Sequence, residues 1–248
     1  MDYVDRIVLN NIDCRRAYEG STLIATIESR PPVDDPFVTF TAAGSSTIGF
    51  IRIANGQTLE YSTDKTNWSN MTAETSLSLN AGDKVYVRGT LSQNLLRTNY
   101  TQFDITGNVS LSGNINALWS YQDLTVGVKN FCGNFMFYEC TGLRDISNLK
   151  FPNSIAQGCY RNMFYHCKYI TTAPELPATV IGDSAYYQMF YNCTRLSYIK
   201  CLATEIQYNG TYNWVYNVAS SGTFVKDANT TWYENSSGIP VGWTVIDA

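Results

Sequence analysis

The sequence predicts a mainly β protein with short helical turns, in which two β modules precede a short repeat solenoid and a C-terminal cap. Apolar and polar residues alternate through the first half of the chain, which is the pattern of half-buried strands. A segment of about 26 residues then recurs in the second half, and such a period indicates stacked repeats. Apolar residues make up 44% and charged residues 15% of the 248 residues, which fits a folded chain.

The first β module is expected at residues 1–28, as short strands separated by turns at "NN" and "EGS". Ile7 and Leu9 follow strand spacing, and so do Leu23 and Ala25. The next segment, "SRPPVDDP" at residues 29–36, holds three prolines and two aspartates. This composition breaks strand pairing and predicts a linker.

A small antiparallel β-sandwich-like domain is expected at residues 37–118. The segments "FVTFTA", "TLEYST" and "SLSLNAGDKVYVRG" alternate apolar and polar residues, with turns at "ANGQ" and "NAGDK". Trp68 lies in a polar stretch of this domain. We interpret it as a core or edge anchor, with a ligand platform as the alternative.

The repeats are expected to form a solenoid at residues 119–206. "FCGNFMFYECTGL", "GCYRNMFYHCKYI" and "SAYYQMFYNCTRL" align on Met136, Met163 and Met189, and a degenerate copy places Trp214 in the methionine position. An apolar residue lies eight positions before each anchor, at Val128, Ile155, Ile181 and Ile206. One repeat cannot bury its apolar side alone, so successive copies must stack.

The spacing within a repeat predicts which side chains face inward. Cys159, Met163 and Cys167 are four residues apart, so on a short helix they would share one buried face. Residues 207–248 contain the degenerate copy and a segment rich in turn residues. We expect them to cap the solenoid through Trp232 and Trp243, with the β domain closing the other end.

The cysteines and the single histidine are the obvious candidates for chemistry. There is no C-x-x-C pair, and His166 is the only histidine, so the usual zinc site is not expected. Cys167 follows His166, but its position in the repeat is also occupied by Cys140 and Cys193, which favours buried structural thiols over a catalytic pair. We therefore expect no catalytic residue, metal or cofactor. The seven cysteines are Cys14, Cys132, Cys140, Cys159, Cys167, Cys193 and Cys201.

The tyrosines give the candidate binding surface. One tyrosine follows each anchor by two residues, on the side of a helix that faces away from the core. We expect an exposed aromatic row, which either stacks on itself and shields the backbone or binds a protein or sugar partner. The row consists of Tyr138, Tyr165, Tyr191 and Tyr216.

Two stretches resemble known families. "TAPELPATVIGDSAYYQMFYNCTRL" resembles the BspA-like leucine-rich repeats, in the "LPAT…MF…C…L" variety of gut Bacteroides and their phages, whose "GTFVK…GIP…GW" ending also recurs here. This resemblance covers residues 128–248. "IVLNNIDCRRAYEGSTLI" is similar to an N-terminal module of phage tail and virion proteins, with Asn10 and Asn11 where glycine and an acid are usual. Together they imply a leucine-rich-repeat virion appendage that attaches through its N-terminal module and carries its repeats outward.

The expected function is therefore that of a non-enzymatic phage virion structural protein: a head or tail fibre, a decoration protein or a tail-tip component. It would be made in the host bacterial cytoplasm and present its repeats to a host-surface glycan or protein, or to other virion proteins. A homo-oligomer, such as a trimer, is expected. The first alternative is a bacterial cell-surface BspA-like adhesin, and the second is a carbohydrate-active enzyme.

Two classes of partner are disfavoured by composition. The net charge of −4 and the pI near 5.0 provide no basic surface for a phosphate backbone, which argues against nucleic acid. No apolar run approaches the roughly 18 to 20 residues that span a bilayer, so membrane insertion is not expected. The acidic start, "MDYVDRIVLNN", also lacks the basic and apolar regions of a signal peptide.

Overall fold

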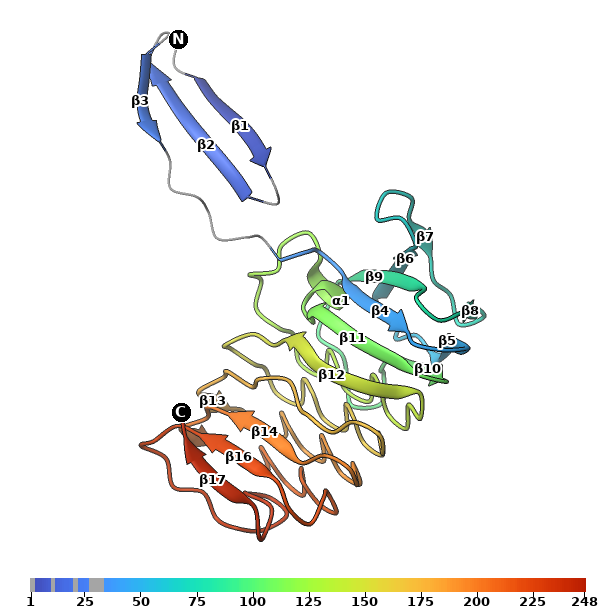
Figure 1. Cartoon of the computed structure of the whole chain (residues 1–248), viewed down its shortest axis with the longest axis vertical. Helices are drawn as coiled ribbons and strands as arrows, with labels where there is room; N and C mark the ends of the chain where they lie inside the picture. Colours follow the sequence, from blue (N-terminus) through green and yellow to red (C-terminus); the bar gives the residue numbers. More distant parts are fainter. Residues whose placement is uncertain (1–2, 10–11, 20–21, 27–33) are drawn as a thin grey trace. The chain divides into compact units, whose positions relative to one another are not determined.

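The computed structural model describes residues 3–9, 12–19, 22–26 and 34–248, which fall into two units, Met1–Asp35 and Pro36–Ala248 (Figure 1). In the first unit, β1 (Tyr3–Leu9), β2 (Ile12–Glu19) and β3 (Thr22–Thr26) form one antiparallel sheet in that order. These strands lie within the range expected for the small β module. Most of the expected linker and the side chain of Cys14 lie outside the described residues.

The second unit begins with two sheets. A six-stranded sheet has the order β12-β11-β4-β9-β6-β7, and a three-stranded sheet has the order β10-β5-β8. Phe40 of the first sheet and Phe103 of the second are buried, with ring centroids 5.4 Å apart. The strands are β4 (Val38–Ala42), β5 (Ser46–Arg52), β6 (Gln57–Ser62), β7 (Ser69–Asn70), β8 (Leu77–Leu79), β9 (Lys84–Leu91), β10 (Gln102–Thr106), β11 (Val109–Asn114) and β12 (Leu143–Lys150).

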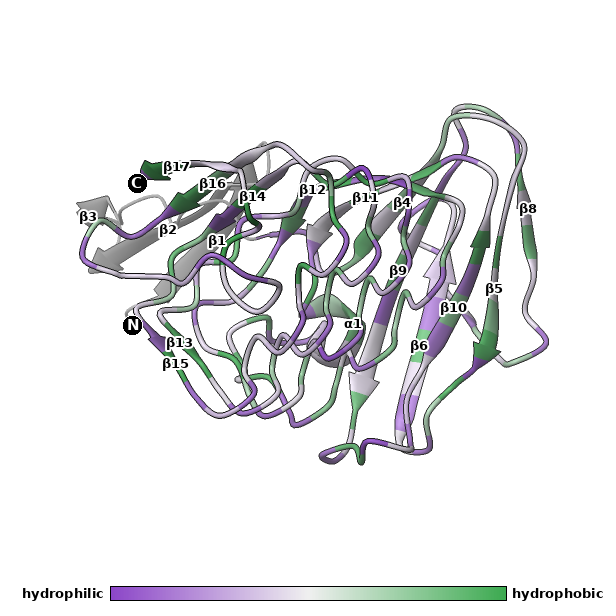
Figure 2. Ribbon diagram, turned by 90° about the horizontal axis from the view of Figure 1, so that it is seen from below, coloured by the Kyte–Doolittle hydropathy of each residue, from purple (hydrophilic) through white to green (hydrophobic). Residues whose placement is uncertain are grey.

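The alternation in the sequence produces these strands as expected. Alternate residues of β4, β9 and β10 are buried, and Figure 2 colours the strands of both sheets by hydropathy. The predicted turns are present, with Gly56 at φ 88° and Gly82 at φ 91°, a conformation that favours glycine. Trp68 is half-buried, 6.1 Å from Phe37, and the Arg88 guanidinium lies 3.8 Å from its ring centroid. Trp68 therefore acts as an edge anchor.

Beyond these sheets the chain is arranged in stacked layers (Figure 1). We call residues 128–154, 155–180, 181–205 and 206–221 layers 1 to 4. Each layer donates backbone N–H groups to carbonyls of the next, as in Phe137 to Met163 at 3.0 Å and Phe164 to Met189 at 3.0 Å. The strands of this part are β13 (Val180–Ile181), β14 (Tyr198–Cys201), β15 (Glu205–Ile206), β16 (Thr223–Lys226) and β17 (Thr244–Asp247).

The two sheets and the layers are continuous. β12, in layer 1, pairs in parallel with β11, so one sheet crosses residue 118, where we expected a domain boundary. At the other end β14, β16 and β17 pair in parallel, which continues the stack into the C-terminal segment. The ring of Trp232 lies 5.7 Å from that of Trp214, and Trp243 Nε1 donates to the carbonyl of Ala219 at 2.8 Å. Both tryptophans thus contact residues of layer 4.

The predicted short helical turns are wrong. In the described residues the only helix is α1 (Ala117–Ser120), and none is long and apolar enough to cross a membrane. In each layer three residues spaced four apart have a positive φ, as at Gly158, Asn162 and His166 in layer 2, and this interrupts a helix. The chain instead forms consecutive four-residue turns, in which alternate N–H groups bond locally, as in Met163 to the carbonyl of Tyr160 at 3.2 Å.

The inward face was predicted correctly even though the conformation was not. A turn of four residues returns every fourth side chain to the same side, as a helix approximately does. Cys159, Met163 and Cys167 are fully buried, and so are Met136, Met189 and Trp214 in the other layers. The anchors therefore form the core of the stack.

Candidate binding surface

The four predicted tyrosines form one column along the stack, with one ring from each layer. The ring centroids of Tyr138 and Tyr165 are 4.7 Å apart, those of Tyr165 and Tyr191 are 4.8 Å apart, and those of Tyr191 and Tyr216 are 4.6 Å apart. The interplanar angles are 8°, 6° and 17°. The rings are half-exposed and form a continuous row along the layers.

The stacking determines which part of each ring a partner can touch. Tyr165 and Tyr191 have a parallel ring on both sides, so both of their faces are covered. Their edges and hydroxyl groups remain accessible. Burial raises the pKa of Tyr138 to about 12 and also raises the pKa of Tyr165, so these hydroxyls stay protonated near neutral pH. The inner tyrosines therefore offer hydrogen-bonding groups, and a sugar cannot stack on their faces.

A second aromatic column, which the sequence analysis missed, lies four residues upstream of the first. Tyr187 and Tyr212 stack with centroids 5.0 Å apart, and the buried Arg161 guanidinium lies 3.5 Å from the Tyr187 ring centroid. The signal was in the sequence, because Tyr187 and Tyr212 each precede a predicted tyrosine by four residues. We call the two columns, Tyr138, Tyr165, Tyr191, Tyr216, Tyr187 and Tyr212, the tyrosine face.

The cysteines lie on the opposite, inward side of the layers. Cys140, Cys167 and Cys193 donate from Sγ to the carbonyls of Phe103, Phe137 and Phe164 at 3.3, 3.1 and 3.0 Å. Burial raises the pKa of all three thiols well above the usual value, which disfavours the nucleophilic thiolate. Cys167 is thus a buried structural thiol, as the repeat position predicted.

His166 belongs to a polar ladder beside the tyrosine face. Asn192 Nδ2 lies 2.5 Å from His166 Nε2, and Asn217 Nδ2 donates to Asn192 Oδ1 at 2.8 Å. Glu139 Oε1 lies 4.0 Å from His166 Nδ1. All four residues have positive φ and occupy the same place in successive layers. Burial lowers the pKa of His166 below its usual 6.5, with Glu139 opposing this shift.

Replacing His166 with asparagine is expected to remove part of the pH dependence of stability. A lowered pKa means that the unfolded chain binds more protons, so stability falls as the pH decreases below about 6.5. His166→Asn places in layer 2 the residue type that layers 3 and 4 have at this position, Asn192 and Asn217. Asparagine also tolerates the φ of 59° found at His166. The melting temperature of the variant should fall less than that of the wild type between pH 7 and pH 5. Equal falls would contradict this role of the histidine.

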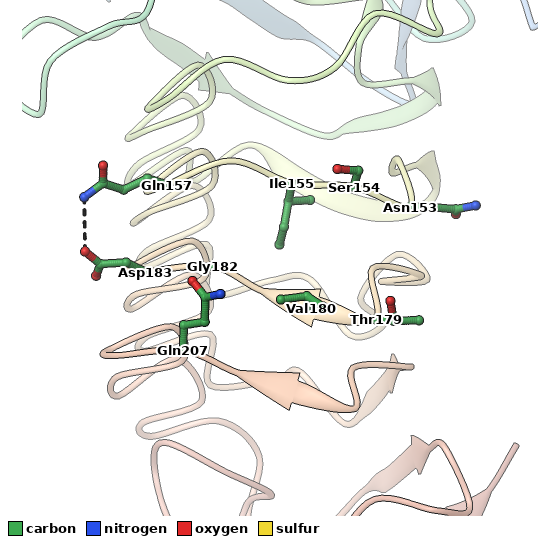
Figure 3. A pocket seen from close by; sticks show the side chains of 9 residues that line it. All are labelled: Asn153, Ser154, Ile155, Gln157, Thr179, Val180, Gly182, Asp183 and Gln207. Atoms are coloured by element: carbon green, nitrogen blue, oxygen red, sulfur yellow. Dashed lines mark hydrogen bonds between the residues drawn. The ribbon is translucent and has the colours of Figure 1, made fainter.

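A polar hollow lies on another side of the stack (Figure 3). It has a volume of about 720 Å³, and residues of layers 1 to 4 line it: Asn153, Ser154, Ile155, Gln157, Thr179, Val180, Gly182, Asp183 and Gln207. Gln157 Nε2 donates to Asp183 Oδ2 at 3.1 Å. Asp183 is the only ionisable side chain in this lining. The lining of the hollow therefore lacks the second carboxylate that general acid–base catalysis by a carboxylate pair requires.

The tyrosine face is a regular, partly exposed feature that extends over four layers. Across the described part of the chain, no group of three or more histidine, cysteine or acidic side chains is placed to hold a metal ion. Comparisons of the chain with protein-family models, with curated proteins and with solved structures give no match.

Proposed function

We propose that this chain is a non-enzymatic structural protein of a bacteriophage particle, as part of a fibre, a decoration or a tail tip, that contacts a host surface or other virion proteins through the tyrosine face. One observation carries the proposal. Tyrosines from four successive layers are stacked at 4.6 to 4.8 Å and expose their edges and hydroxyls in a regular row. Tyrosine is enriched at protein interfaces because it combines rigid apolar area with a polar group.

The phage setting and the finer fold are part of the same proposal. The layers are interpreted as a short BspA-like leucine-rich-repeat solenoid, placed between a β-sandwich-like domain and a C-terminal cap. Hydrogen bonds between residues 24 to 26 positions apart in successive layers support this interpretation, and so do the buried anchors. The similarity of the N-terminal segment to phage tail and virion modules supports attachment through residues 1–28. The expected homo-oligomer would multiply weak contacts, since linked copies bind with avidity.

Antibody labelling of intact particles tests the setting. An antibody raised against residues 36–248 should decorate phage particles in negative-stain electron microscopy, and an antibody against an unrelated host cytoplasmic protein serves as the control. Labelling of the bacterial envelope in uninfected cells, without labelling of particles, would instead support the alternative cell-surface adhesin.

Removing two inner hydroxyls tests the face itself. Tyr165→Phe with Tyr191→Phe keeps both rings stacked and should leave the melting temperature within about 1 °C of the wild type, since exposed sites contribute little. Binding of the purified chain to fixed host cells should weaken about tenfold, the effect of losing roughly two hydrogen bonds. Tyr169→Phe, at an exposed tyrosine outside the two columns, is the matched control. Unchanged binding of the double variant would reject the inner hydroxyls as contacts.

A further inference from the structure

The C-terminal end of the tyrosine face differs from the rest of it. Tyr212 and Tyr216 are the last rings of the two columns, stacked at 5.0 Å on Tyr187 and at 4.6 Å on Tyr191. Their side chains are 44% and 46% exposed, and those of Tyr187 and Tyr191 are less exposed. Each terminal ring therefore has one covered face and one outer face.

The next stretch of chain does not cover these outer faces. Ser236 and Ser237 follow layer 4 in space, and they bond to the residues between the tyrosines. The N–H of Val215 donates to the Ser236 carbonyl at 3.1 Å, and the N–H of Asn213 donates to Ser237 Oγ at 2.9 Å. The cap thus closes the inner side of layer 4 over Trp214, whose Nε1 donates to the Gly238 carbonyl. The tyrosine side of the layer stays exposed.

The rings of Tyr212 and Tyr216 are oriented so that their outer faces are directed along the axis of the stack. The Tyr212 ring is 23° from the plane of Tyr187, and the Tyr216 ring is 17° from the plane of Tyr191. Their outer faces consequently point away from layer 3. Tyr208, which is 80% exposed, lies four residues before Tyr212 in the sequence. Layer 4 is the layer that presents aromatic faces as well as edges.

A hydrogen-bond donor accompanies these faces. The N–H of Glu139, His166 and Asn192 each bonds the tyrosine carbonyl of the following layer at 2.8 Å. Asn217 occupies the same position in layer 4, with a φ of 56°, so its N–H is directed beyond the layer. No side chain from Gln207 to Val225 is charged. Aromatic faces, an amide donor and no charge suit a neutral ligand with an apolar face and hydroxyl groups.

We propose that this end of the stack binds a neutral pyranose ring of a glycan. The C–H face of the sugar would lie on the outer face of Tyr216 or Tyr212, because the negative face of an aromatic ring attracts C–H groups. The oxygen of a sugar hydroxyl would accept a hydrogen bond from the backbone N–H of Asn217. A nucleotide base could also stack, but its phosphate finds no cation in this segment. The proposal names the ligand class of the tyrosine face, and its host setting rests on the proposed function.

Saturation-transfer difference NMR on the whole chain tests the site, with the methyl glycosides of glucose, galactose, mannose and N-acetylglucosamine as probes. At least one glycoside should receive saturation, and most strongly at the C–H groups of one ring face. Tyr216→Ala should lose that signal, and Tyr212→Ala should reduce it. Tyr169→Phe, at an exposed tyrosine outside the two columns, should retain it. If the alanine variant unfolds, Tyr216→Leu keeps apolar contact with Tyr191 but removes the aromatic face, and should also lose the signal.

Three results would overturn the proposal: no transfer to any of the four glycosides, equal transfer in folded Tyr216→Ala or Tyr216→Leu, or stronger transfer to adenosine monophosphate than to the glycosides. These results are separate from the test of the phage setting. Particles that label with antibody while the purified chain binds no glycoside would refute only the sugar site. A sugar-binding chain that is absent from particles would refute only the virion assignment.

Discussion

Replacing Phe164 with alanine is expected to lower the free energy of unfolding by about 3 to 5 kcal/mol. Phe164 is fully buried between the rings of Phe137 and Phe190, at centroid distances of 5.5 and 5.7 Å and interplanar angles of 7° and 4°. Both neighbours are held by backbone bonds between layers, so the cavity cannot close by a side-chain movement alone. Urea denaturation followed by circular dichroism measures the change.

Two further variants separate the cavity from general damage to layer 2. Phe164→Leu keeps most of the buried volume and should cost about 1.5 kcal/mol or less. Tyr165→Phe changes the adjacent, half-exposed residue and should cost about 0.5 kcal/mol or less. If Phe164→Ala lowers the free energy of unfolding by less than about 1 kcal/mol, the stacked rings of Phe137, Phe164 and Phe190 are not the core of the stack.

The inward side chains of the layers were predictable from spacing alone, but the backbone was not. Residues four apart share a side in a helix and in a run of four-residue turns, so Cys159, Met163 and Cys167 could not distinguish the two. A second signal would have done so. Residues that tolerate positive φ recur at a spacing of four residues, one position before buried or half-buried residues, at Gly158 and Asn162, at Asn192, and at Asn209, Asn213 and Asn217.

The exposure of the tyrosine row was also predictable, whereas the availability of its ring faces was not. In a helix and in a run of four-residue turns alike, the residue that follows a buried anchor by two positions faces outward. Whether the faces are covered depends on the distance between layers, and hydrogen bonds between distant residues set that distance, as between Asn192 and Tyr216. Tyr165 and Tyr191 therefore stack on their neighbours and have no free ring face. Only the last ring of each column has an outer face on which a ligand could stack.

The connection between the sheets and the layers could not be predicted from local patterns. β10 and β11 lie within residues 37–118, which were expected to form a β-sandwich-like domain, but nothing in their own residues shows that layer 1 stacks on them. The partners are distant in sequence: Phe103 donates its N–H to the Met136 carbonyl at 2.8 Å, and its ring stacks on Phe137 at 5.2 Å. The sheets thus provide the surface on which the first layer forms.

Gly142 lies where this connection is tightest. Its N–H donates to the Ile105 carbonyl at 2.8 Å, and its own carbonyl accepts the N–H of Val109 at 2.9 Å. It therefore joins the end of β10 and the start of β11 to layer 1, next to the first residue of β12. A Cβ atom at this position would lie 2.5 Å from the carbonyl carbon of Thr106 and 2.7 Å from the Ile105 oxygen. These are backbone atoms, so no rotation of a side chain relieves the contact.

Gly142→Ala is accordingly expected to destabilise the protein by about 3 kcal/mol, at the upper end of the usual cost of overpacking. Both hydrogen bonds of Gly142 must lengthen together, because the methyl group pushes the same segment of backbone away. Hydrogen exchange should show faster exchange at Val109 and Gly142 than in the wild type, while a central amide such as Phe164 changes least. Gly127→Ala is the control, since its added Cβ meets no atom within 4 Å and should change stability by about 0.5 kcal/mol or less. Equal effects of the two substitutions would mean that layer 1 does not depend on its contact with β10 and β11.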